Sequence, residues 1–195
     1  MRDRLLEFKH VTMRFGGVTA LDDVSIHVNE GEIAALIGPN GAGKTTVFNV
    51  LTGVYAPTEG HVEFNGQSIV GRKRSEITRL GLARTFQNIR LFHEMTALEN
   101  VLVGADAHSK SSVPGALLGL PRKRREERAA HEKALELMEF MGVAHRAHDL
   151  AKSLPYGDQR RLEICRALAT NPEVLLLDEP AAGFTPVEKE VLGRQ

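Results

Sequence analysis

One stretch of the chain has the residue types and spacing of a loop that binds phosphate. It reads GPNGAGKTT over residues 38–46 and fits the pattern G-x-x-x-x-G-K-[ST]. Its glycines let the backbone form a concave nest whose N–H groups point at phosphate oxygens. Lys44 can reach the outer phosphates of a nucleotide, and the hydroxyl of Thr45 can hold Mg²⁺. The expected nucleotide-binding residues of this loop are Gly38, Asn40, Gly41, Ala42, Gly43, Lys44, Thr45 and Thr46.

Two acidic residues near the C-terminal end form a second candidate group. Asp178 and Glu179 follow the apolar run at residues 174–177 directly. In open α/β sheets, ligands bind at the carboxyl ends of the strands. Asp178 is therefore expected to hold Mg²⁺, and Glu179 to act as the general base that polarises an attacking water. Together with the phosphate loop, the pair indicates nucleotide hydrolysis.

The flanking sequence predicts the elements that would position these groups. Residues 32–37 have the pattern of a short buried strand, and residues 44–51 that of a helix ending before Gly53 and Pro57. The run at 174–177 follows Asn-Pro and predicts a buried parallel strand.

The N-terminal region predicts antiparallel strands around the phosphate loop. Apolar and polar residues alternate between residues 5 and 29, and Gly16-Gly17 marks a turn within that region. A further strand at 61–64 leads into Asn65-Gly66, a strong signal for a tight hairpin turn.

Helix is predicted to dominate residues 96–169. Thr96 and Glu99 have the spacing of a capping box at a helix start. Residues 109–121 are rich in Ser, Gly and Pro and are expected to form a loop or hinge. A later apolar stripe at helical spacing, ending at Gly142, is typical of a core-facing helix. The stripe consists of Ala134, Leu137, Met138 and Met141.

Composition limits the partners and the compartment. The chain has 25 basic and 25 acidic residues among 195, so its bulk charge gives no indication of a nucleic-acid partner. Its single cysteine, Cys165, suits a reducing compartment and is expected to be a small core residue. No apolar run approaches the length of about 20 residues that spans a membrane. We therefore expect a cytoplasmic protein that would serve a membrane only from its surface, through a partner.

Several further segments resemble the motifs of ATP-binding cassette (ABC) ATPases. LPYGDQRR at 154–161, followed by ICRALA at 164–169, resembles their signature segment. Gln87 in ARTFQ resembles their Q-loop glutamine, and Phe15 sits where they place an aromatic that stacks on adenine. Residues 181–183 look like their D-loop. The resemblance runs from residue 5 to the last residue, with the motifs in family order.

The resemblance implies an α/β fold: a P-loop NTPase core with a mainly parallel sheet, an N-terminal antiparallel β subdomain and an inserted α-helical subdomain. Residues 1–87 would hold the antiparallel β and P-loop part, 88–170 the helical subdomain, and 171–195 the Walker B segment and D-loop of a single domain. Two cassettes, identical or different, would enclose two Mg-ATP molecules between them. Transmembrane permease subunits, and indirectly a solute-binding protein, would be the other partners, at the inner face of the cell membrane.

The resemblance also implies roles for individual residues. Gln87 would contribute to catalysis and to the Mg²⁺ site, which Thr45 and Asp178 complete. Tyr156, Gly157 and Asp158 of the signature segment would contact the nucleotide of the partner cassette. The signature helix would begin near Gly157 and direct its N-terminus at that nucleotide.

The signature reads Leu-Pro-Tyr-Gly-Asp where the common pattern is Leu-Ser-Gly-Gly-Gln, so Pro155 replaces a serine that would bind phosphate. This variant, together with the RTFQ segment and the insertion at 115–121, resembles cassettes that import branched-chain amino acids. Cassettes for polar amino acids or lipopolysaccharide are the nearest alternatives, and a soluble non-transport ABC ATPase is a more distant one. The family's switch histidine should follow Walker B, whereas the last histidine is His148. We therefore expect a truncated form of a cassette of about 250 residues, the size that the resemblance implies, and an inactive fragment remains an alternative.

Overall fold

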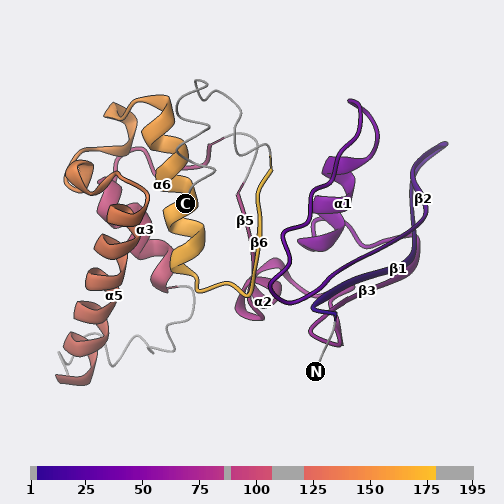
Figure 1. The fold of residues 1–195 in the computed structure, drawn as a ribbon, viewed down its shortest axis with the longest axis horizontal. Coiled ribbons are helices and arrows are strands. Elements are labelled where there is room, and N and C mark those ends of the chain that lie inside the picture. Colours follow the sequence, from indigo (N-terminus) through magenta and orange to yellow (C-terminus); the bar gives the residue numbers. More distant parts are fainter. Residues whose placement is uncertain (1–3, 86–88, 107–120, 179–195) are drawn as a thin grey trace. The chain divides into compact units, whose positions relative to one another are not determined.

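The computed structural model describes residues 4–85, 89–106 and 121–178 (Figure 1). The chain forms two compact units, Met1–Ile77 and Thr78–Gln195. The predicted division at residues 87 and 170 stays a prediction.

The first unit contains a four-stranded antiparallel sheet in the order β2-β1-β3-β4. Its strands are β1 (Leu6–Phe15), β2 (Val18–Val28), β3 (Glu59–Phe64) and β4 (Gln67–Ser68). Both predicted turns are confirmed, whereas the predicted alternation holds at Leu6 and Phe8 and is lost at residues 10–13, where the register of β1 with β2 shifts and His10 is exposed. Asn65 and Gly66 have φ values of 53° and 73° between β3 and β4, as a two-residue hairpin of the primed type requires.

Helix α1 (Lys44–Leu51) lies at the position predicted for it and contacts β2. Val47, Val50 and Leu51 are buried on the helix, and Gly53 follows with a φ of 67°. Buried side chains of the sheet complete the core of this unit. They are Leu6, Phe8, Val11, Met13, Leu21, Val62 and Phe64.

Residues 32–37 do not form the buried strand predicted for them. No strand is present there, and Ile33 and Ile37 are 100% and 89% exposed. A strand exists only when a neighbour accepts and donates its main-chain hydrogen bonds. Within this unit the four strands pair with one another and leave residues 32–37 outside the sheet. The apolar pattern of residues 32–37 therefore indicates a propensity for strand, but no strand of this unit pairs with them.

At Gly60, strand β3 passes very close to the main chain of strand β1. Its φ is 88°, and a Cβ atom there would overlap the carbonyl oxygen of His10 on β1. Gly66 also has a positive φ, of 73°, but a Cβ atom there meets nothing within 4 Å.

We expect Gly66→Ala to lower the free energy of unfolding by about 1–2 kcal/mol through its backbone conformation. Gly60→Ala should cost roughly 1–3 kcal/mol more, because the strand must also move to accommodate the methyl group. Urea unfolding of the two variants measures the difference. Equal losses would contradict the close approach of β3 to His10.

The second unit contains two parallel strands, β5 (Leu82–Arg84) and β6 (Val174–Leu176). Their register places Arg84 beside Leu176. The predicted parallel strand at 174–177 is thus confirmed over 174–176, but its residues are half-buried rather than buried. Helix α2 (Arg74–Arg79) precedes β5 in the chain.

Three helices of the second unit surround an apolar core (Figure 1). They are α3 (Ala97–Ala105), α5 (Pro121–Phe140) and α6 (Tyr156–Ala169), with short 3₁₀ helices η2 (Ala144–Arg146) and η3 (Ala151–Ser153) between α5 and α6. Cys165 is fully buried in this core, and burial raises the pKa of its thiol to about 12. The expectation that Cys165 is a core residue is confirmed.

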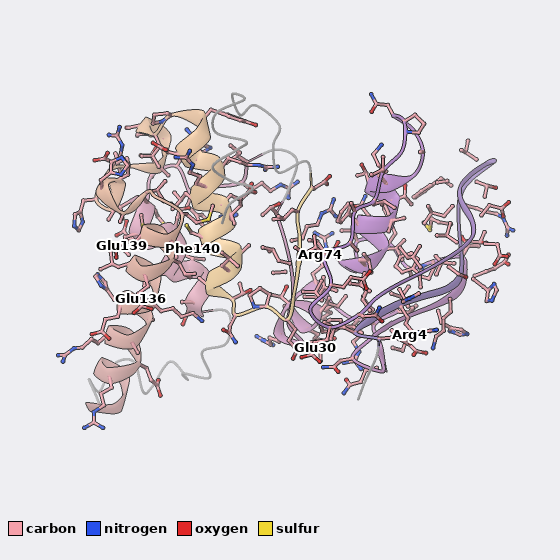
Figure 2. The ribbon with its side chains drawn as sticks, viewed as in Figure 1. Arg4, Glu30, Arg74, Glu136, Glu139 and Phe140 are labelled. Atoms are coloured by element: carbon pink, nitrogen blue, oxygen red, sulfur yellow. The ribbon has the colours of Figure 1, made fainter. Side chains whose placement is uncertain are left out.

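The predicted stripe on α5 is confirmed, with Leu137 half-buried against the core. Ala134 and Met138 on the helix and Met141 just beyond it are buried, whereas the intervening Glu136 and Glu139 are exposed (Figure 2). Gly142 lies in the turn that follows α5 and has a φ of 71°. The predicted loop at 109–121 lies outside the described residues except for Pro121, which begins α5 and occupies the helix position that proline favours.

The capping box at the start of α3 is confirmed. Glu99 N donates to Thr96 Oγ1 at 3.2 Å, and Thr96 N donates to Glu99 Oε2 at 2.7 Å. The main-chain N–H and the hydroxyl of Thr96 lower the pKa of the Glu99 carboxyl. This cap fixes the point at which the chain enters the helical core.

Candidate nucleotide-binding site

In the loop that precedes α1, two of the three glycines adopt a backbone conformation that favours glycine, and the predicted phosphate nest stays a prediction. Gly41 and Gly43 have φ values of 84° and 83°, in the left-handed region that other residues rarely adopt. At Gly43 space is also restricted. A Cβ atom there would lie 2.6 Å from Ala20 O and 2.8 Å from a Leu21 methyl group on β2. Glycine at 43 therefore allows the loop to pass close to the sheet just before the helix begins.

Lys44, the first residue of α1, folds back over this loop. Its Nζ donates to the carbonyl oxygens of Gly38 and Pro39, at 2.6 and 2.7 Å. Phosphate oxygens are stronger acceptors for an ammonium group than neutral carbonyls are. The lysine is thus already directed at the loop, where an incoming phosphate could take over its hydrogen bonds.

The start of α1 is suited to an anion. The helix has no acidic residue in its first turn, and no side chain caps it. Its N-terminal N–H groups and the positive end of its dipole are therefore available to phosphate. Thr45 is exposed and Thr46 half-buried in this first turn. A threonine hydroxyl is the kind of oxygen ligand that Mg²⁺ accepts, so the donor set fits Mg²⁺-bound phosphate.

Phe15 lies at the end of β1 and forms an aromatic pair that the sequence did not reveal. Its ring centroid is 5.0 Å from that of Tyr55, with an interplanar angle of 76°. Both side chains are 40% exposed. Tyr55 follows α1 and donates its main-chain N–H to Asn49 O on that helix. Tyr55 therefore links Phe15, the residue expected to stack on adenine, to helix α1.

Asp178, which follows β6, is buried and held by two arginines. Arg84 Nη2 lies 2.8 Å from Asp178 Oδ2, and both side chains are 10% exposed or less. Arg160 Nη2 donates to the main-chain oxygen of Asp178 at 2.6 Å. Asp178 N donates to Thr85 Oγ1 at 3.4 Å. The sequence predicted the carboxylate at this strand end but neither arginine.

The ionic network continues onto α6. Arg160 Nη1 lies 2.6 Å from Glu163 Oε2, with side chains 0% and 2% exposed. Glu163 Oε1 accepts from Arg90 N at 3.4 Å. The signature helix is thus joined to the end of β6 and to the segment that follows residues 86–88.

The signature segment begins its helix where predicted. Helix α6 starts at Tyr156, with Pro155 as its N-cap and no side-chain capping bond. Tyr156 is 48% exposed. Asp158 lies in the first turn, 3.4 Å from Arg161 Nη1 and 3.8 Å from Arg146 Nε. The helix N-terminus is open to an anion, while the Asp158 carboxylate is already paired with arginines.

Gln87, Glu179 and the D-loop segment at 181–183 lie outside the described residues, so their roles stay predictions. Within the described part of the chain, no cluster of three or more metal-ligating side chains was found. None of the helices in these residues combines the length and the hydropathy that a membrane span requires.

Comparison with known proteins adds independent information. The ABC transporter family model matches residues 21–182. The chain is 48% identical over 188 residues to the high-affinity branched-chain amino acid transport ATP-binding protein BraF of Pseudomonas aeruginosa, covering 96% of this chain and 74% of BraF. It is 46% identical over 192 residues to the protein of the same description, LivG, of Escherichia coli K12, covering 98% and 75%.

Solved structures show the same similarity. The ADP conformation of MJ1267, an ATP-binding cassette of an ABC transporter, matches with a TM-score of 0.82 and 36% identity, covering 98% of this chain and 74% of that one. The dimeric structure of MJ0796, a bacterial ABC transporter cassette, matches with a TM-score of 0.80 and 27% identity, covering 97% and 80%.

Proposed function

Because the chain belongs to the ABC transporter family, we propose that it is the ATP-binding and hydrolysing subunit of a transporter that imports branched-chain amino acids. Members of this family couple ATP hydrolysis to transport. The observation that carries the proposal for this chain is the glycine loop with the Lys44 ammonium folded over it at the start of α1. The amino-acid substrate is inferred from the descriptions of BraF and LivG.

In the proposed mechanism the first unit binds the nucleotide. The loop N–H groups and the α1 dipole hold the phosphates, and Lys44 neutralises part of their charge. The ring of Phe15 stacks on adenine, and the edge-to-face contact with Tyr55 restricts its orientation. Thr45, Asp178 and Gln87 would hold Mg²⁺, which supplies positive charge to the reacting phosphate.

Hydrolysis is assigned to Glu179 as general base, with Gln87 helping to position the water. The N-terminus of α6, at Tyr156 and Gly157, would face the nucleotide of a second cassette in a dimer. Pro155 supplies no hydroxyl there, so this half of the site would rely on main-chain N–H groups. Permease subunits and a solute-binding protein would complete the transporter, with the cassettes at the cytoplasmic membrane face.

Uptake of labelled leucine by membrane vesicles that carry the assembled transporter tests the proposal. We expect Lys44→Ala to reduce ATP-dependent uptake to background, because the phosphates lose their main side-chain counter-charge. Lys152→Ala is the matched control, since the Lys152 side chain forms an exposed ion pair with Glu94. Excess isoleucine or valine should compete with leucine, and histidine should not.

Full uptake by the Lys44→Ala vesicles would contradict the role in transport. Competition by histidine, and none by valine, would contradict the branched-chain substrate and leave the ATPase role standing.

A further inference from the structure

Arg84 contacts the same carboxylate that is expected to hold Mg²⁺. It is the last residue of β5, and the parallel register with β6 places it beside Leu176, two residues before Asp178. The 2.8 Å contact joins Arg84 Nη2 to Asp178 Oδ2, with side-chain exposures of 6% and 10%. A metal approaching Asp178 must therefore reach a carboxylate that already has a cationic neighbour in a poorly solvated position.

Arg160 plays a different part at the same residue. It donates to the main-chain oxygen of Asp178, and its other nitrogen pairs with Glu163. The charge of Arg160 is thus balanced on its own helix, whereas that of Arg84 faces the Asp178 carboxylate. Arg160 fixes the backbone at the strand end, so the carboxylate can change partner without the backbone having to move.

We propose that Arg84 is a positioning residue for metal binding: it holds the Asp178 carboxylate in place before Mg-ATP arrives and lowers the attraction of that carboxylate for Mg²⁺. The inference rests on the proposed function. The Arg84 guanidinium and Mg²⁺ compete for the Asp178 carboxylate, and in a buried site the electrostatic interaction of each with the carboxylate is strong. Mg²⁺ that displaces Arg84 must break the ion pair, and Mg²⁺ that shares the carboxylate with Arg84 is repelled by it. Both arrangements weaken the contribution of Mg²⁺ to nucleotide binding.

The test measures the binding of a fluorescent ATP analogue to the full chain, with excess Mg²⁺ and with EDTA. The quantity of interest is the ratio of the two dissociation constants, EDTA over Mg²⁺. We expect Arg84→Gln to raise this ratio on the order of tenfold, because one unit charge next to the carboxylate is removed. Arg79→Gln, which changes an exposed arginine at the end of α2, should leave the ratio unchanged. Asp178→Asn should bring it close to one.

A purely structural role for Arg84 would weaken binding in both conditions and leave the ratio equal or lower, and that result would overturn the inference. Thermal melts establish that each variant is folded. If Arg84→Gln does not fold, Arg84→Lys decides, since an ammonium replaces the planar guanidinium and should hold the carboxylate less firmly. A ratio above that of the parent chain supports the inference, and a ratio at or below it overturns the inference.

Failure of the proposed function would give a different result. Lys44→Ala would then bind the analogue as tightly as the parent chain, whatever Arg84→Gln does. An unchanged ratio in Arg84→Gln, combined with lost binding in Lys44→Ala, would overturn only the inference on Arg84.

Discussion

The Lys44→Ala variant is expected to lose the thermal stabilisation that Mg-ATP gives to the parent chain. At a ligand concentration of about 100 times Kd, binding to the folded state alone adds roughly 2.7 kcal/mol. For a chain of this size that corresponds to a rise in Tm of roughly 5–10 °C. Lys44 already lies over the loop, bonded to Gly38 and Pro39. Its removal takes away the charge-assisted bonds to phosphate, so Tm with and without Mg-ATP should coincide.

The same melts without nucleotide supply the internal control. The two bonds of Lys44 end on exposed carbonyl groups of the loop, so the variant alone should melt close to the parent chain. Lys152→Ala makes the same substitution at an exposed lysine outside the loop. This variant should keep the full shift in Tm with Mg-ATP. A shift that survives in Lys44→Ala would mean that the nucleotide binds elsewhere.

Most of the elements that were predicted correctly are determined by nearby residues. The capping box of Thr96 and Glu99, the Asn65-Gly66 turn and the helix start at Lys44 each depend on a few consecutive residues with a specific conformational preference. The family comparison confirms the resemblance that these and the other motifs indicated. Local chemistry of this kind can be read from a single sequence.

The predictions that failed, or were never made, depend on partners distant in the chain. Residues 32–37 have strand propensity, but pairing decides whether a strand forms, and no strand of their unit pairs with them. Arg84 and Asp178 are 94 positions apart, and only the β5–β6 register brings them together. Tyr55 reaches Phe15 through the turn that follows α1, which has no motif of its own. The motifs predicted Asp178 and Phe15 themselves, whereas the residues that contact them became known only from the structure.

Arg160→Met is expected to destabilise the second unit strongly. Arg160 is fully buried, and it pairs with Glu163 and binds the Asp178 main-chain oxygen. Breaking a buried pair by removing one partner costs about 3–5 kcal/mol, because the remaining charge stays unsolvated. The expected fall in Tm is about 6–20 °C for a chain of this length. Urea and thermal unfolding, followed by circular dichroism, measure both quantities.

Two further variants separate the charge effect from the loss of packing. Arg161→Met changes the next residue, whose ion pair with Asp158 is partly solvated, and should cost at most about 1 kcal/mol. Adding Glu163→Gln to Arg160→Met removes the stranded charge and keeps an oxygen for Arg90 N, so roughly half of the lost stability should return. A double variant no more stable than Arg160→Met would attribute the loss to packing. Recovery would instead show that the unpaired Glu163 charge causes much of the loss, and that Arg160, once paired with Glu163, joins the signature helix to the main chain at Asp178.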